Sequence, residues 1–214
     1  MNRDLHHYRK SYEHGELNLQ NVSEDPFQQF QEWFQKADAL EAIEEANAMT
    51  LSTVGEDGFP RGRVVLLKEF SKQGFVFYTN YGSEKGRAIA KHPKICVSFF
   101  WPALEQQVII KGVAEKVPEE QSVAYFKKRP RKSQLGALVS DQSEPIINRE
   151  ALETKLVALE KQFEGLEIPK PKNWGGYLLR PSAFEFWQGR RSRLHDRIQY
   201  VKNGETWDIQ RVQP

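Results

Sequence analysis

Residues 48–79, with the sequence AMTLSTVGEDGFPRGRVVLLKEFSKQGFVFYT, decide the fold class of this chain. They contain three short runs of apolar and β-branched residues, which predict strands at 48–54, 60–68 and 75–79. The gaps between these runs read GEDG and KQG, and both sequences favour tight turns. Short strands joined by tight turns indicate an antiparallel sheet.

Outward from this stretch, the chain alternates further short strands with a few helices. Strands are predicted at 94–101, 106–117, 175–180, 183–188, 197–202 and 206–212. Helices are predicted at 83–91, 119–128 and 148–163, for a turn or two after Pro130, and after the capping pair Asp25-Pro26. Asn203-Gly204, between the last two strands, favours a type I′ turn.

This pattern predicts a mainly β domain with peripheral helices (α+β), folded as an antiparallel barrel. We expect one such domain over residues 25–214. Residues 1–24 are polar, and we expect them to form a mobile N-terminal segment.

Composition excludes several classes of protein. The 214 residues carry 31 Lys and Arg against 29 Asp and Glu, a net charge of +2, which argues against a general polyanion binder. The mean hydropathy is −0.67 and apolar runs are short, so we expect no membrane span, no secretion signal and a cytoplasmic location. With one Cys, with five His that lack metal-ligand spacing, and without a GxGxxG or Walker A motif, we expect no metal and no nicotinamide or ATP site.

A second informative stretch is residues 184–197, FEFWQGRRSRLHDR, which carries four arginines and a histidine. Cations this close repel one another, and a fold tolerates them best when they meet an anion. Arginine matches phosphate and stacks on flat rings, and Trp187 adds a flat face. The stretch suggests a phosphorylated, planar ligand. A solvated basic turn or a nucleic-acid patch is an open alternative.

Arg63 and Lys68 flank an apolar strand, and Lys85 follows Ser83 at the start of a predicted helix. Residues five apart on a regular strand face opposite sides, so both cations reach one ligand only through a bulge or a ligand lying across the strand end. A helix N-terminus with Ser and Lys nearby can bind phosphate, although Ser83 is also a simple N-cap.

Tyr125, Arg129 and Ser133 are spaced by four, which stacks them on one helical face if the chain bends favourably at Pro130. They would then form a phosphate cradle. The alternative is a basic surface helix over 127–132, which could serve as a localisation or RNA patch.

Five separated motifs resemble, in order, those of the pyridoxamine 5′-phosphate oxidase family. They are Arg63-Val64-Val65-Leu66-Leu67-Lys68, Phe77-Tyr78-Thr79-Asn80, Glu105-Gln106-Gln107-Val108, Arg129-Pro130-Arg131-Lys132-Ser133-Gln134, and Trp187-Gln188-Gly189 with Arg193-Leu194-His195-Asp196-Arg197. The resemblance runs from about Tyr8 to the C-terminus.

This resemblance implies a split β-barrel that binds FMN and a homodimer with the flavin at the subunit interface. The implied reaction is oxidation of pyridoxamine or pyridoxine 5′-phosphate to pyridoxal 5′-phosphate by dioxygen, in vitamin B6 biosynthesis and salvage. It releases hydrogen peroxide, and ammonia from the amine. Another flavin- or haem-binding split-barrel protein with a different substrate remains open, as does a basic RNA-binding module. We expect neither nucleic acid nor membrane as a partner.

The resemblance also assigns roles to residues. It implies FMN contacts by Arg63, Val64, Val65, Leu66, Leu67, Lys68, Tyr78, Thr79, Lys85, Gln107, Gln142, Ser143, Trp187 and Arg197. It implies that the substrate phosphate is bound by Lys68, Tyr125, Arg129 and Ser133. Arg193, Leu194 and His195 would contact the substrate ring, with Arg193 and His195 as the catalytic pair, and Arg9, Lys10, Ser11 and Tyr12 would partly cover it.

Two details of this assignment depend on local structure. One strand-like alternation separates Arg193 from His195, so both side chains can face one pocket. Glu84 stands where the family commonly has a second basic residue, and its charge would oppose a phosphate if it pointed inward. Arg87, on the same predicted helix, could compensate.

Overall fold

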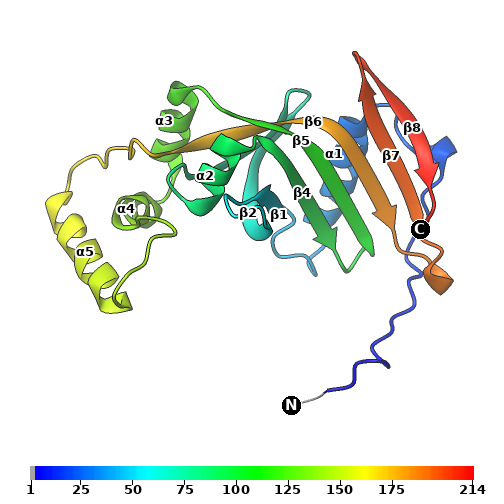
Figure 1. Ribbon diagram of the computed structural model, residues 1–214, viewed down its shortest axis with the longest axis horizontal. Helices are drawn as coiled ribbons and strands as arrows, with labels where there is room; N and C mark the ends of the chain where they lie inside the picture. The colour runs from blue at the N-terminus through cyan, green and yellow to red at the C-terminus, as the bar shows by residue number, and fades with distance from the viewer. Residues whose placement is uncertain (1–2) are drawn as a thin grey trace. The chain divides into compact units, whose positions relative to one another are not determined.

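Eight β-strands and five α-helices make up residues 3–214, the part of the chain that the computed structural model describes (Figure 1). The strands are β1 Ala48–Val54, β2 Pro60–Ser71, β3 Gly74–Asn80, β4 Lys94–Trp101, β5 Gln106–Lys116, β6 Trp174–Gln188, β7 Asp196–Asn203 and β8 Thr206–Val212. The helices are α1 Pro26–Asp38, α2 Glu84–Lys91, α3 Glu119–Lys128, α4 Arg131–Val139 and α5 Arg149–Gln162. Two short 3₁₀ turns span Leu19–Asn21 and Arg191–Arg193.

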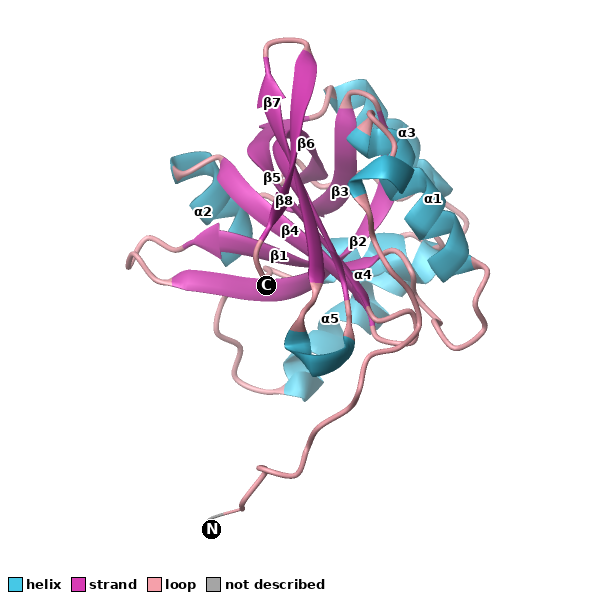
Figure 2. Ribbon diagram, turned by 90° about the vertical axis from the view of Figure 1, so that its right-hand side faces the viewer, coloured by secondary structure: helices cyan, strands magenta, loops and turns pink. Residues whose placement is uncertain are grey.

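The strands hydrogen-bond in the order β3-β2-β1-β4-β5-β6-β7-β8, and β3 also pairs with β6. This extra pairing closes the first six strands of the order into a ring, so the predicted mainly β barrel with helices is confirmed. One detail was wrong: the predicted strands 175–180 and 183–188 form the single strand β6. Its second half pairs with β7, and β7 pairs with β8, all antiparallel and side by side (Figure 2).

The chain divides into two compact units. One contains the residues up to Thr50 together with Cys96–Lys111 and Pro181–Pro214, and we call it the terminal unit. The other contains Leu51–Ile95 and Gly112–Arg180, and we call it the central unit. A single domain over 25–214 stays a prediction, as does the mobility of residues 1–24, of which residues 1 and 2 lie outside the described part.

An aromatic core holds the terminal unit together. Helix α1 begins as predicted, because the Asp25 carboxylate accepts the Phe27 N–H at 2.9 Å and Pro26 opens the first turn. The helix buries Phe30, whose ring centroid lies 5.1 Å from that of Phe99, and Trp33, which lies 5.3 Å from Phe186. The apolar face of α1 therefore packs on the inward-facing side chains of β4 and β6 and forms one apolar layer with them.

In the central unit, helices α3 and α4 pack through a smaller core. Its buried members are Phe126, Leu135, Ile168 and Trp174. Leu156 and Leu159 of α5, and Phe163 directly after it, pack against this core half-buried, while Leu152 of the same helix is exposed. This core fixes the junction between α3 and α4, where Arg129 lies.

The β7–β8 hairpin differs from the predicted type I′ turn. Asn203 pairs with Thr206, so the two turn residues are Gly204 and Glu205, one position later than expected. Gly204 has φ +58°, and Glu205 is not among the residues with positive φ. A type I′ turn needs positive φ at both central positions, and this hairpin has it only at the glycine.

None of the helices in residues 3–214 is long and apolar enough to cross a membrane.

The core of the terminal unit makes a direct stability prediction. Phe30→Ala should lower the free energy of unfolding by about 3–5 kcal/mol, because Phe30 is fully buried and its removal leaves a cavity. Phe59→Ala is the matched control: Phe59 is 72% exposed, and we expect a change within about 0.5 kcal/mol. Urea unfolding at one fixed protein concentration measures both, and equal effects would contradict this account of the core.

Candidate functional site

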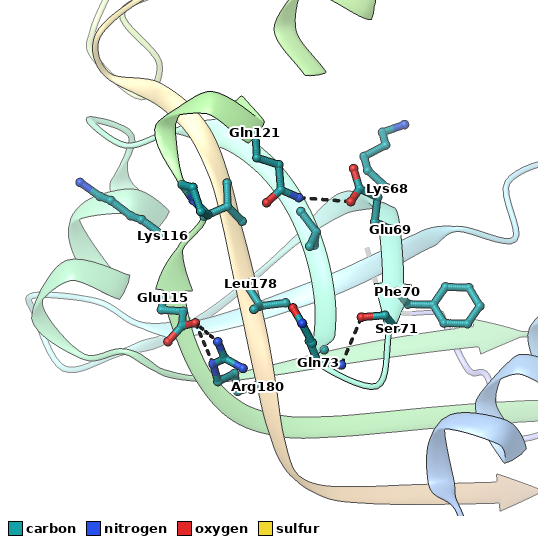
Figure 3. Close-up of a pocket in the computed structure, with 14 residues that line it drawn as sticks. Lys68, Glu69, Phe70, Ser71, Gln73, Glu115, Lys116, Gln121, Leu178 and Arg180 are labelled. Atoms are coloured by element: carbon teal, nitrogen blue, oxygen red, sulfur yellow. Dashed lines mark hydrogen bonds and ion pairs between the residues drawn. The ribbon is translucent and has the colours of Figure 1, made fainter. Parts of the chain in front are cut away.

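Two hollows of the central unit contain residues that the sequence predicted for the site. The larger, about 840 Å³, lies between the β2–β3 hairpin, the end of β5 and the start of α3 (Figure 3). Three of its charged groups have polar partners: Arg180 Nε donates to Glu115 Oε1 at 2.7 Å, and Gln121 donates to Glu69 at 3.2 Å. An anionic ligand would have to compete with these partners.

The smaller hollow has a volume of about 470 Å³. It is lined by most of the sequence-predicted site residues that lie in the central unit. We call it the cationic cavity, after Lys68, Lys85 and Arg129. Of the sequence-predicted residues it is lined by Val64, Val65, Leu66, Lys68, Tyr78, Thr79, Lys85, Tyr125, Arg129, Ser133 and Gln142. The sequence did not single out its other lining residues, Asn80, Gly136, Ala137, Ser140 and Trp174.

A β-bulge in β2 lets Lys68 line this cavity. The pairing of β2 with β3 shifts by one residue between Leu67 and Glu69. A bulge was one of the two ways, beside a ligand lying across the strand end, in which Arg63 and Lys68 could reach one ligand. The structure has the bulge, but Arg63 and Leu67 are not among the cavity residues. Arg63 Nη1 donates to Thr53 Oγ1 at 2.7 Å, and Leu67 is buried in the core.

The start of α2 forms one end of the cavity. Ser83 is buried and caps the helix by accepting the Gly86 N–H at 3.3 Å. Gln142 Oε1 accepts hydrogen bonds from Lys85 Nζ at 2.8 Å and from Thr79 Oγ1 at 3.3 Å. Burial, and then the charge of Arg63, lower the pKa of Lys85. A desolvated ammonium beside a helix N-terminus favours an anion.

Ser143 and Glu84 flank this helix start. Ser143 Oγ accepts the Glu84 N–H at 3.2 Å. The Glu84 carboxylate pairs with Arg61 and, at 3.9 Å, with Arg63 Nη2, so two cations of β2 compensate its charge. Arg87, the other cation that the sequence suggested here, pairs with Glu144 at 3.0 Å. Glu84 is therefore engaged with β2.

The junction between α3 and α4 forms the opposite end of the cavity. Tyr125, Arg129 and Ser133 all line it, although α3 ends at Lys128 and Pro130 caps α4. The Arg129 guanidinium carbon lies 4.7 Å from the centroid of the Trp174 ring. Its Nη1 is buried and has no hydrogen-bond partner in the described residues. Burial lowers the pKa of Arg129, and the nearby Tyr125 opposes that shift.

A buried guanidinium nitrogen without a partner is unfavourable unless a ligand satisfies it. The neighbouring basic residues are used differently. Arg131 donates to the carbonyls of Phe163 and, at 3.0 Å, Leu166, and Lys127 pairs with Glu167 at 2.7 Å. These contacts argue against the alternative of a wholly solvated basic helix over 127–132. Trp174 was missed because it lies 45 positions after Arg129 in the sequence, and no local signal links the two residues.

The remaining predicted residues belong to the terminal unit, where three rings gather. The Tyr12 centroid lies 5.6 Å from that of Trp187 and 5.7 Å from that of His195, and Trp187 and His195 are 4.8 Å apart. His195 Nδ1 accepts the Arg190 N–H at 3.1 Å. The neutral ring therefore carries its proton on Nε2.

Arg193 and Leu194 are exposed beside these rings. The strand-like alternation expected for Arg193 and His195 was wrong. Both residues precede β7, and Ser192 and Arg193 have φ +56° and +62° in a 3₁₀ turn. Positive φ at two successive non-glycine residues is a strained backbone, which is common at functional sites.

The other predicted residues of the terminal unit are largely engaged with the protein itself. Gln107 donates to Ser98 Oγ at 3.1 Å, across β5 and β4. Arg197 makes two hydrogen bonds to Glu185, at 2.8 and 3.0 Å, and one to the Gln213 carbonyl at 2.8 Å. Arg9 and Ser11 are exposed.

The N-terminal residue Lys10 pairs with Glu105 at 3.2 Å. No group of three or more His, Cys, Asp or Glu side chains that could hold a metal ion occurs within residues 3–214.

Comparison with known proteins identifies close relatives. A family model described as pyridoxamine 5′-phosphate oxidase matches residues 36–163, and one described as the pyridoxine 5′-phosphate oxidase C-terminal dimerisation region matches residues 174–214. A pyridoxine/pyridoxamine 5′-phosphate oxidase of Flavobacterium psychrophilum is 55% identical over 213 residues, 99% of this chain and 100% of the relative. One from Christiangramia forsetii is 54% identical over the full length of both chains.

A solved structure agrees with the fold. PhzG from Burkholderia lata, in complex with tetrahydrophenazine-1-carboxylic acid, is 28% identical to this chain and superimposes with a TM-score of 0.85. The match covers 91% of this chain and 95% of that one.

The ring cluster makes a prediction about His195. Burial, then the charge of Arg193, hold the pKa of His195 below its usual range, and Asp196 opposes them. Arg193→Gln should therefore raise the pKa of His195, and Asp196→Asn should lower it further. An NMR titration of the imidazole measures both. Lys202→Gln is the control, because it removes an exposed charge on β7, and it should leave the pKa of His195 unchanged. An unchanged pKa of His195 in Arg193→Gln would mean that the arginine points away from the imidazole.

Proposed function

Because the chain belongs to the pyridoxamine 5′-phosphate oxidase family, we propose that it oxidises pyridoxamine and pyridoxine 5′-phosphate to pyridoxal 5′-phosphate, using FMN and dioxygen. The co-products are hydrogen peroxide and, from the amine, ammonia. This activity belongs to vitamin B6 biosynthesis and salvage. The observation that carries the substrate assignment is the buried, unpartnered Nη1 of Arg129 in the cationic cavity.

The residues around Arg129 suit a phosphate monoester. Lys68 and Arg129 supply positive charge, and Tyr125 and Ser133 supply hydroxyl donors, all in the lining of the same cavity. A phosphate oxygen would accept a charge-assisted hydrogen bond from Arg129 Nη1, which otherwise has no partner within residues 3–214. The Trp174 ring behind the guanidinium holds it in position.

The other end of the cavity suits the phosphate of FMN. Lys85 is desolvated, and it lies at a capped helix start with Thr79, Gln142 and Ser143. Val64, Val65 and Leu66 would lie along the flavin, with Arg63 and Leu67 in the same strand and Tyr78 on the next. When bound, FMN supplies the two-electron acceptor that dioxygen later restores.

The protein's own part is to bind, orient and hold protons. Gln107, Trp187 and Arg197 would complete the flavin contacts. Arg193 would hold the substrate ring in register, which a planar guanidinium does better than an ammonium. His195 carries its proton on Nε2, because Nδ1 accepts a backbone N–H, and could donate a hydrogen bond to the substrate from there. Leu194 and residues 9–12 would cover the ring.

Residues 174–214 match a dimerisation region, which supports a homodimer. We also propose a cytoplasmic location, with no nucleic acid and no membrane as partners.

The test of this function is direct. We expect the purified protein to bind FMN, to convert pyridoxamine 5′-phosphate to pyridoxal 5′-phosphate over many turnovers only when oxygen is present, and then to form hydrogen peroxide in equal amount. Flavin binding without this conversion would contradict the substrate but keep the cofactor. A colourless protein that neither binds added FMN nor turns over would contradict both.

The phosphate cradle yields a second prediction. Arg129→Ala should weaken substrate binding about ten- to a hundredfold, because a charge-assisted hydrogen bond contributes roughly 1.5–3 kcal/mol. FMN content should not change. Lys128→Ala is the matched control, since this exposed neighbour removes the same charge outside the cavity. Loss of FMN with normal substrate affinity in Arg129→Ala would mean that the two phosphate ends are interchanged.

A further inference from the structure

Glu105 is a buried acid that the proposed function does not use. It lies in the turn between β4 and β5, and it is 1% exposed. Its backbone has φ +56°, a conformation that non-glycine residues rarely adopt. A buried carboxylate on a strained backbone persists only where the surrounding contacts require both.

All the recorded partners of its carboxylate come from one short N-terminal stretch. Glu105 Oε2 accepts the backbone N–H of Glu13 at 2.6 Å and that of His14 at 3.0 Å. Glu105 Oε1 pairs with Lys10 Nζ at 3.2 Å. Burial acts to raise the pKa of Glu105, but the bonds from His14, Lys10 and Glu13 outweigh it and hold the pKa below its usual range. The carboxylate is therefore ionised at neutral pH.

The other side of the Glu105 turn contacts the end of β6. The Glu105 carbonyl accepts the Gly189 N–H at 2.8 Å. Tyr12 packs directly on that glycine: a Cβ atom at position 189 would lie 2.7 Å from Tyr12 Cγ and 3.1 Å from Glu105 Cβ. Only glycine leaves room for the tyrosine ring there.

These contacts determine where Tyr12 lies. Glu13, the residue after Tyr12, donates its backbone N–H to Glu105, and the Tyr12 ring packs against Gly189. The ring consequently stands at an edge-to-face angle of 87° to Trp187 and 5.7 Å from His195. Without the carboxylate, two peptide N–H groups and an ammonium would lose their shared acceptor, and water could replace it.

We propose that Glu105 is a positioning residue that latches the N-terminal segment, fixing Tyr12 against Trp187 and His195 so that its ring forms one wall of the substrate-ring site. This rests on the proposed function, in which Trp187 and His195 serve the flavin and the substrate. Glu105 acts through residues 10–14 and does not touch the substrate itself.

The first test measures the latch without any turnover. In Glu105→Gln the FMN-loaded protein should keep its flavin, and amide hydrogen exchange of Glu13 and His14 should accelerate about tenfold, because the amide oxygen of Gln accepts their N–H groups without the negative charge that strengthens both bonds. Glu16→Gln is the matched control, since this exposed acid of the same segment pairs only with the Arg190 side chain among its recorded contacts. Unchanged exchange in Glu105→Gln overturns the latch.

The second test asks whether the latch works through Tyr12. Glu105→Gln should raise KM for pyridoxamine 5′-phosphate about tenfold with little change in kcat, and should add nothing in a Tyr12→Ala background. Independent, multiplying effects overturn the proposal. If Glu105→Gln fails to fold, Gly189→Ala provides the second route: its methyl group displaces chiefly Tyr12 and retains the Glu105 carboxylate, and it should raise KM in the same way. A normal KM in Gly189→Ala overturns the role of Tyr12.

The two tests also separate this proposal from the proposed function. If the wild-type protein does not oxidise pyridoxamine 5′-phosphate, the proposed substrate is wrong. The exchange measurement still decides whether Glu105 holds the N-terminal segment. Wild-type activity with unchanged exchange in Glu105→Gln keeps the function and removes the latch.

Discussion

The antiparallel pairing of β3 with β6 is the constraint on which the candidate site depends. It closes the ring of six strands, and it joins residues nearly a hundred positions apart, with Tyr78 opposite Gly176 and Asn80 opposite Trp174. The Tyr78 and Trp174 rings stack at 5.5 Å as a consequence. Arg129 rests on that Trp174 ring, and the cationic cavity forms around the stack. Without this pairing, Trp174 would not be held against Arg129 in the cationic cavity.

Electrostatics distinguishes the two hollows of the central unit. In the larger one, Arg180 and Glu69 already have polar partners, and a ligand would gain little by displacing them. In the cationic cavity, Lys85 and Arg129 are desolvated, and burial lowers the pKa of both. An anion stabilises a partly desolvated cation, so a ligand with phosphate groups would be favourable at both ends of this cavity.

In the terminal unit, by contrast, two acids of low exposure already have cationic partners within the protein. Glu105 pairs with Lys10 of the N-terminal segment, and Glu185 pairs with Arg197. Such buried pairs add little net stability, because desolvation offsets much of the attraction. What they provide is geometry: they fix the backbone and the side chains that surround Trp187 and His195. The strained turn at Ser192 and Arg193 lies in the same neighbourhood.

The sequence by itself determined most of the strands and helices, the caps at Asp25 and Ser83 and the antiparallel class, because periodicity and capping act over a few neighbouring residues. It also determined the family, because each of the five motifs is itself a short stretch that can be read without the fold. Tertiary structure decided the rest. The shift of the hairpin turn to Gly204-Glu205 and the bulge at Lys68 depend on cross-strand register. The approach of Trp174 to Arg129 and the bonds from residues 13 and 14 to Glu105 join distant parts of the chain, and packing selects them without a local signal.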